Sequence, residues 1–152
     1  MIIINADETP HPGEGMTVSD YLSSNTLQDI GKLILRVSLG ILILFHGMGK
    51  IVHGIGPVQG MVAGMGLPGF LAYGVYLGEV LGPVLLVPGF HARIGAGLIA
   101  INMVIAILLA HTGDLLSLSA HGGWRLELQG MYLVTALALV CLGPGRFSLN
   151  QR

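Results

Sequence analysis

Seven polar side chains lie within or beside stretches of the sequence that are otherwise apolar, and these residues are the best suited to chemistry. They are His46, Lys50, Glu79, Asn102, His111, Gln129 and Tyr132. A carboxylate accepts and relays protons, ammonium and phenol groups donate hydrogen bonds, and an imidazole does both. Ionisable groups in an apolar segment are costly to bury and usually mark a binding site or a pathway. We therefore take these seven as candidate ligand-binding residues, with no catalytic residue assigned among them.

Four long apolar segments must position these side chains. They run over about residues 33–52, 70–88, 92–111 and 126–143. Each is close to the roughly 20 residues that a helix needs to cross a bilayer, and four segments are too few to close a β-barrel. The predicted fold class is therefore all-α, an integral membrane bundle of four transmembrane helices.

The composition favours a membrane fold and excludes other classes. Charged residues make up 10% of the 152-residue chain and hydrophobic residues 53%, whereas a charged fraction of roughly 25% is usual in soluble domains. A soluble domain of this size could not bury so much apolar surface. The net charge of −1 offers no basic surface for a nucleic acid. The single cysteine, Cys141, excludes an intramolecular disulfide and a cysteine-bound iron–sulfur cluster, so redox chemistry would need an organic cofactor or another subunit.

The polar and apolar residues divide the chain into two regions. Residues 1–31 hold five of the eight acidic residues and are expected to form a polar cytoplasmic arm, and residues 32–149 form the membrane domain. Basic residues indicate the orientation, because they concentrate on the cytoplasmic side of a membrane. One side would carry only Lys50 and Arg125, and the other would carry Lys32, Arg36, Arg93, Arg146 and Arg152. This bias predicts that both termini lie in the cytoplasm.

The segment 53–69 does not fit a fifth spanning helix. It contains six glycines and two prolines, yet it is mostly apolar. Two interpretations stay open at this point. The segment is either a short interfacial or re-entrant piece that covers the outer face, or a flexible glycine-rich loop.

The four-span topology places six of the candidate residues at similar depth in the outer half of the bilayer. His46 and Lys50 lie four apart on one face of the first helix, and Glu79 lies roughly 13 Å below the outer end of the second. The other three come from the third and fourth segments: His111, Gln129 and Tyr132. We expect a polar pocket that the four helices surround and that opens outward. The structural alternative is that Glu79 pairs with Lys50 or His46 to hold the bundle together, while Asn102 makes an interhelical hydrogen bond.

The order of these residues also resembles a known family. The matching motifs are Arg36, His46-Gly47 with Lys50, Gly66-Leu67-Pro68, Glu79, Arg93, Asn102-Met103, Gly123-Trp124 and Gly143-Pro144-Gly145-Arg146. Over residues 33–149 the chain resembles the DoxX family of small bacterial inner-membrane proteins. The resemblance implies a four-helix, multi-pass protein of the inner membrane. Related members are associated with thiosulfate:quinone oxidoreductase and with membrane oxidoreductase assemblies.

Three functions from different classes fit these observations. The first is a membrane subunit of a quinone-linked oxidoreductase, in which His46, Lys50 and Tyr132 donate hydrogen bonds to a quinone and Glu79 relays protons. The second is a non-catalytic membrane anchor or accessory subunit of a larger complex. The third is a protein that binds or passes a small solute, although the sequence shows no internal repeat of the kind common in transporters. The expected partners are the lipid bilayer and other membrane or peripheral subunits, and not a nucleic acid.

Two further cofactors have weaker support in the sequence. His46 and His111 come from different helices at comparable depth, as a haem would require. His53, His111 and His121 all lie toward the outer face, where they would be available to a metal ion. These histidines lack a spacing of the HxxxH type, so we predict no metal site.

Overall fold

A computed structural model describes residues 25–150 of the chain. Within that range the protein is all-helical, which confirms the predicted fold class. The long elements are α2 (Asn25–His53), α5 (Ala92–Ala110) and α6 (Glu127–Leu142). The shorter elements are α3 (Gly56–Gly64), the 3-10 helices η1 (Gly69–Gly74) and η3 (Thr112–Asp114), the π-helical turn η2 (Leu77–Leu81) and α4 (Gly82–Leu86).

Among residues 25–150, three helical stretches are long and apolar enough to cross a membrane. They are most of α2, all of α5, and the composite span Gly69–Leu86, which consists of η1, η2 and α4 with the residues that join them. The fourth, α6, is apolar but has 16 residues, which gives a length of about 24 Å. All four predicted segments are therefore helical. Residues 25–31, which we expected to belong to the polar arm, form the first turns of α2, and residues 1–24 lie outside the described part.

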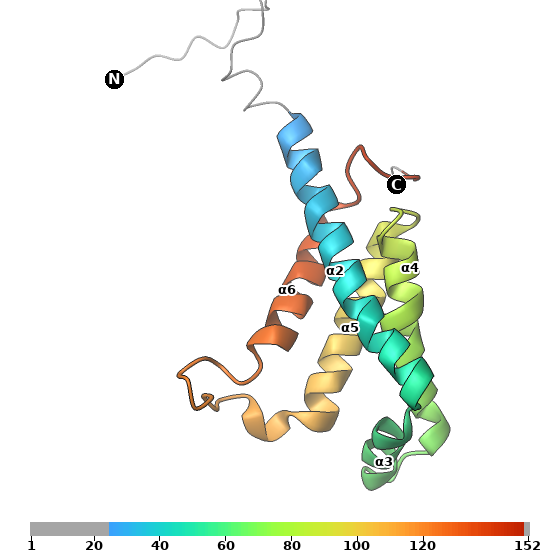
Figure 1. Cartoon of the computed structure of the whole chain (residues 1–152), viewed down its shortest axis with the longest axis vertical. Helices are drawn as coiled ribbons and strands as arrows, with labels where there is room; N and C mark the ends of the chain where they lie inside the picture. The colour runs from blue at the N-terminus through green and yellow to red at the C-terminus, as the bar shows by residue number, and fades with distance from the viewer. Residues whose placement is uncertain (1–24, 151–152) are drawn as a thin grey trace, which may run out of the picture.

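The common core lies where α2, α4, α5 and α6 meet. Its fully buried members include Ile43, Leu86, Ile99 and Ala136. Figure 1 shows that α2 crosses this bundle obliquely, near α6 at one end and near the composite span at the other. The direction of this crossing decides which neighbours each polar side chain of α2 meets.

One end of the bundle gathers most of the basic residues that we expected on the cytoplasmic side. The buried Arg36 guanidinium donates hydrogen bonds to the Pro144 carbonyl at 2.9 Å and to the Phe147 carbonyl at 2.6 Å. These bonds hold the C-terminal tail, residues 143–150, against the first half of α2. Arg93 lies beside Gly143 and Lys32 beside Gly145 in the same region. The start of α2 and the C-terminal tail therefore lie at the same end (Figure 1), as an even number of spans requires.

The glycine-rich segment 53–69 is largely helical. α3 folds back against η1 and α5 and forms a small second core in which Ile55, Val62 and Ala72 are buried. Gly54 and Gly66 flank it with φ angles of 83° and 75°, a left-handed conformation that glycine adopts without strain. Of the two interpretations of this segment, the helix favours the short interfacial or re-entrant piece over the glycine-rich loop. Its depth in the membrane, interfacial or re-entrant, stays a prediction.

Candidate functional site

A cavity of about 350 Å³ lies between α3, the composite span and α5, near the C-terminal end of α2. Its walls are apolar except for four side chains, which are Lys50, Glu79, Asn102 and His111. Small-molecule sites commonly have this form, an apolar hollow into which a few polar groups converge. Four of the seven candidate residues from the sequence therefore meet at one cavity.

The polar floor of the cavity is centred on Glu79, which is 5% exposed. Lys50 Nζ donates to one carboxylate oxygen, Glu79 Oε2, at 2.5 Å. The carboxamide nitrogen of Asn102, also buried, donates to the other oxygen at 3.4 Å. One positive and one negative charge thus balance within the floor. This is the pairing that the structural alternative anticipated, and it lies on the wall of a cavity.

The local backbone brings Glu79 to this position. Pro83 has no amide hydrogen, so it cannot bond to the Glu79 carbonyl four residues earlier as an α-helix would require. The chain instead forms the π-helical turn η2, in which the Gly82 amide bonds to the Leu77 carbonyl. Such turns widen a helix locally and occur often at functional sites.

Two glycines allow neighbouring helices to approach this turn closely. A Cβ at Gly47 of α2 would collide with the backbone carbonyl of Glu79, and a Cβ at Gly78 would collide with the Asn102 side chain. Small residues of this kind let membrane helices pack with their backbones close together. The sequence places Gly47 and Gly78 next to candidate residues, but their role depends on contacts that only the fold reveals.

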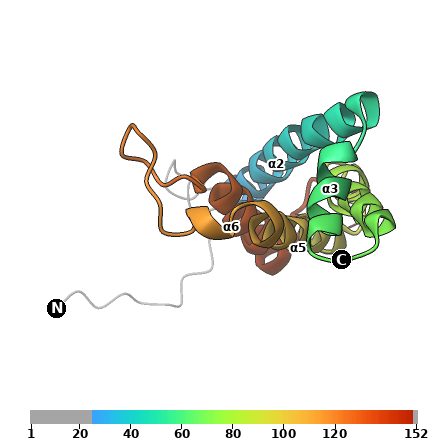
Figure 2. The same cartoon turned by 90° about the horizontal axis from the view of Figure 1, so that it is seen from below.

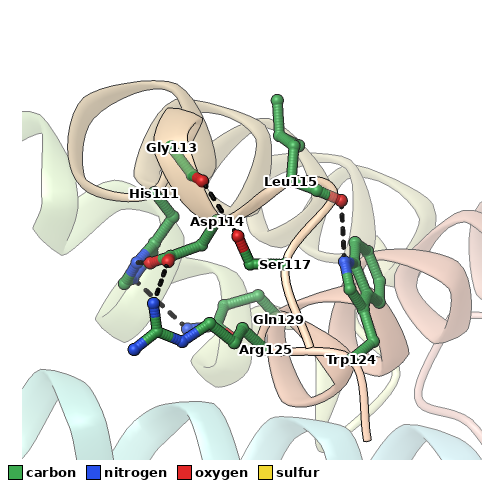
Figure 3. A network of polar contacts seen from close by, with 8 residues as sticks. All are labelled: His111, Gly113, Asp114, Leu115, Ser117, Trp124, Arg125 and Gln129. Carbon is green, nitrogen blue, oxygen red and sulfur yellow. Dashed lines mark hydrogen bonds and ion pairs between the residues drawn. The ribbon is translucent and has the colours of Figure 1, made fainter. Parts of the chain in front are cut away.

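His111 lies where α5 ends and lines the cavity there. Its Nδ1 is 3.6 Å from Asp114 Oδ2, and its Nε2 is 3.4 Å from the Gln129 amide nitrogen. Arg125 bonds to the other Asp114 oxygen at 2.7 Å. Figure 3 shows these four side chains as one network that links the 111–126 loop to the start of α6. Trp124 closes the loop through a bond from Nε1 to the Leu115 carbonyl at 2.8 Å.

His46 and Tyr132 do not line the cavity, and this corrects the expectation of one pocket formed by the six candidate residues placed at similar depth. Their rings contact each other edge to face, with centroids 6.0 Å apart, and His46 is exposed. His46 and Lys50 are separated by about 40° around α2. Because α2 crosses the bundle obliquely, that angle is enough to direct His46 toward α6 and Lys50 toward the composite span. Gln129 reaches the cavity only through His111.

Sequence reasoning missed two contributors to the site. The Tyr76 hydroxyl donates to the Lys50 carbonyl at 3.2 Å and fixes the end of α2 beside the composite span. Asp114 also gained no role from the sequence, because it lies in a polar loop. Among residues 25–150, no group of three or more histidine, cysteine, aspartate and glutamate side chains is arranged to hold a metal ion. The two histidines considered for a haem have different neighbours, Tyr132 for His46 and Asp114 for His111.

Comparison with known proteins places this geometry in a family. A sequence model of the DoxX family matches residues 31–112. The chain is 32% identical to "Putative oxidoreductase CatD" of Bacillus subtilis (strain 168), over 80% of this chain and 86% of that protein. It is 31% identical to "Inner membrane protein YqjF" of Escherichia coli (strain K12), over 82% of this chain and 93% of that protein. No solved structure matches the chain significantly.

Proposed function

The chain belongs to the DoxX family, and on that premise we propose that it is the membrane subunit of a quinone-linked oxidoreductase. The cavity is the observation that supports this function. Its apolar walls suit a quinone ring, and its floor offers hydrogen-bond donors beside a carboxylate. The relative named "Putative oxidoreductase CatD" matches this chain over most of its own length, and its name agrees with this reaction class.

The roles of the floor residues follow from their chemistry. An ammonium group has three donor hydrogens, and among the described residues Lys50 Nζ bonds to Glu79 alone. Lys50 therefore has donors left for a quinone carbonyl, and the Asn102 carboxamide adds another. Glu79 stands beside that carbonyl as the group that exchanges a proton when the ring changes its oxidation state. Electrons would come from a partner subunit or an organic cofactor.

We further propose a location in a bacterial inner membrane with both termini in the cytoplasm. The gathering of Arg36, Arg93 and Lys32 at one end supports this orientation, because basic residues are enriched on the cytoplasmic side. A relative is named as an inner membrane protein. The cavity would then lie toward the outer face. A reporter fused after Arg152 should read cytoplasmic and one inserted near Ser119 external, and the reverse pattern would contradict the proposal.

The central experiment measures quinone retained by the protein in lipid nanodiscs, corrected for empty nanodiscs. Glu79→Gln keeps the side-chain volume and removes the charge, and we expect it to lower retention about tenfold. His46→Leu is the matched control, because His46 lies outside the cavity, and it should leave retention unchanged. Equal retention by wild type and Glu79→Gln would remove the cavity as the quinone site.

One observation favours the accessory-subunit function as a second candidate. The rings of His46 and Tyr132 pair on a flank of the bundle where His46 is exposed, and among the described residues neither ring makes a hydrogen bond. Polar side chains in a spanning segment are normally covered by protein. Isolation in mild detergent separates the two functions: a stoichiometric partner without quinone would favour the accessory role, and bound quinone would favour the first.

A further inference from the structure

One wall of the cavity is made of side chains that are also exposed on the surface of the bundle. Ile101 and Ile105 of α5 are 60% and 47% exposed, and Met61 of α3 is exposed as well. We call these three residues the side opening. Figure 2, which views the molecule from the end that bears α3, shows α3 beside α5. Exposed apolar side chains on a spanning helix face the acyl chains, so the cavity meets the bilayer here.

The α3 side of this opening is anchored by a small core. The helix has nine residues, and that core buries Val62 with Ile55 and Ala72. Gly54 and Gly66, both with positive φ, end the segment that carries it. The rest of the cavity is firm, because Gly78 and Gly82 of the composite span pack directly onto α5. Of the two helices that border the side opening, α3 is therefore the one that can yield to a ligand.

The floor limits the charge of what can bind. Lys50 and Glu79 balance each other, and Asn102 is neutral. A charged ligand would add an uncompensated charge to an apolar cavity, which is strongly unfavourable. An uncharged group that both accepts and donates hydrogen bonds meets the needs of the ammonium, the carboxamide and the carboxylate.

From these observations we infer that the ligand enters from the bilayer between α3 and α5 and keeps an apolar tail in the side opening. The site thus selects a molecule dissolved in the membrane, with an uncharged hydrogen-bonding ring and an apolar tail. This inference rests on the proposed function, and it adds the route of entry and the place of the apolar tail.

Two substitutions on one helix test the route. Ile105 and Leu108 are both exposed on α5, but only Ile105 lines the cavity. We would place Ile105→Trp and Leu108→Trp proteins in nanodiscs and measure retention of a benzoquinone with a long alkyl tail. The same ring with a methyl group in place of the tail is the second probe. Unchanged melting temperatures would show that both variants fold, and Ile101→Trp would replace Ile105→Trp if that variant did not.

We expect Ile105→Trp to lower retention of the tailed quinone about tenfold and to spare the tailless ring, while Leu108→Trp changes neither. If Glu79→Gln abolishes retention but Ile105→Trp does not lower it, the cavity binds quinone and the side entry is wrong. Equal losses of both probes in Ile105→Trp would also contradict a tail site. If the wild type retains neither probe above empty nanodiscs, the proposed function fails and the inference fails with it.

Discussion

The helix α2 carries two cations that point into the protein, the buried Arg36 in its first half and the half-buried Lys50 near its end, and their surroundings differ in kind. Arg36 is 2% exposed and donates to two backbone carbonyls. Lys50 pairs with the side chain of Glu79 on the wall of a cavity. A backbone carbonyl neither titrates nor leaves its place, whereas a carboxylate can do both. The contacts of Arg36 hold the C-terminal tail against α2, whereas the Lys50–Glu79 pair can rearrange when a ligand binds.

The packing around Arg36 and around Lys50 also differs. At Arg36 the packing is close, since a Cβ added to Gly89 would collide with the guanidinium. At Lys50 the ion pair borders the cavity of about 350 Å³. A buried charge in a membrane helix is thus not by itself evidence of a binding site. Two features distinguish a binding site from a structural contact: the group that accepts the hydrogen bond from the cation, and the presence of a cavity beside it.

The largest effect should come from Lys50→Met, which leaves the Glu79 carboxylate buried without its partner. Removing one member of a fully buried pair typically costs about 3–5 kcal/mol, and the Lys50 side chain is 27% exposed. We expect a fall in unfolding free energy toward the lower end of that range, measured by denaturation in detergent. Lys50→Met with Glu79→Gln should recover part of the loss, because no uncompensated charge remains. Strictly additive single losses would show that the two residues are not coupled.

Arg36→Met should cost about 2–3 kcal/mol, because two carbonyls of the tail lose charged donors. It should also release residues 143–150 from α2. Limited trypsin digestion at Arg146 would detect the release as faster cleavage. Quinone retention should be unchanged, in contrast to Glu79→Gln. An equal loss of retention in Arg36→Met would erase the distinction between the two regions.

Gly78→Ala should cost about 1–3 kcal/mol through overpacking, because the new methyl group meets the Asn102 side chain. It should also disturb the contact between Asn102 and Glu79 and weaken quinone retention. Gly97→Ala is the control, since a Cβ there meets nothing within 4 Å. The Gly78→Ala protein should melt at a lower temperature than the Gly97→Ala protein. Similar melting temperatures would show that the composite span and α5 are not tightly packed at Gly78.

The smallest effect should come from Arg125→Gln in the exposed network of Figure 3. Arg125 pairs with Asp114 at 2.7 Å, but its side chain is 55% exposed, and exposed pairs contribute below about 1 kcal/mol. We expect a change near the limit of a thermal denaturation measurement. A loss as large as that of Lys50→Met would show that this loop is protected from solvent.

The sequence predicted the spans and the pairing of Glu79 because both depend on local information. Long apolar runs set the length of α2 and α5, and two opposite charges in apolar surroundings must find each other. The basic residues that gather around Arg36 were also predicted to share one end. These features need no knowledge of how the helices cross.

The separation of His46 from Lys50 could not be predicted from their spacing. Side chains four apart share a face on an isolated helix, but the angle at which α2 crosses its neighbours assigns them to different partners. The π-helical turn at Glu79 has a visible cause in Gly82-Pro83, although a proline more often kinks or ends a helix. The helix α3 was not predicted, because its glycines have low helical propensity. Tertiary packing of Val62 and Ile55 overrides that propensity in the fold.

The 16 residues of α6 have a consequence for the lipid as well as for the protein. At about 24 Å the helix is shorter than the roughly 30 Å hydrocarbon layer. We expect the bilayer to thin beside α6, at a cost of a fraction of a kcal/mol for each ångström of mismatch. Such thinning would make an asymmetric dimple in the membrane, deeper on the α6 flank than around α2. Lipids with shorter acyl chains should relieve this deformation and raise the melting temperature, and membranes of uneven thickness should draw the protein toward their thinner regions.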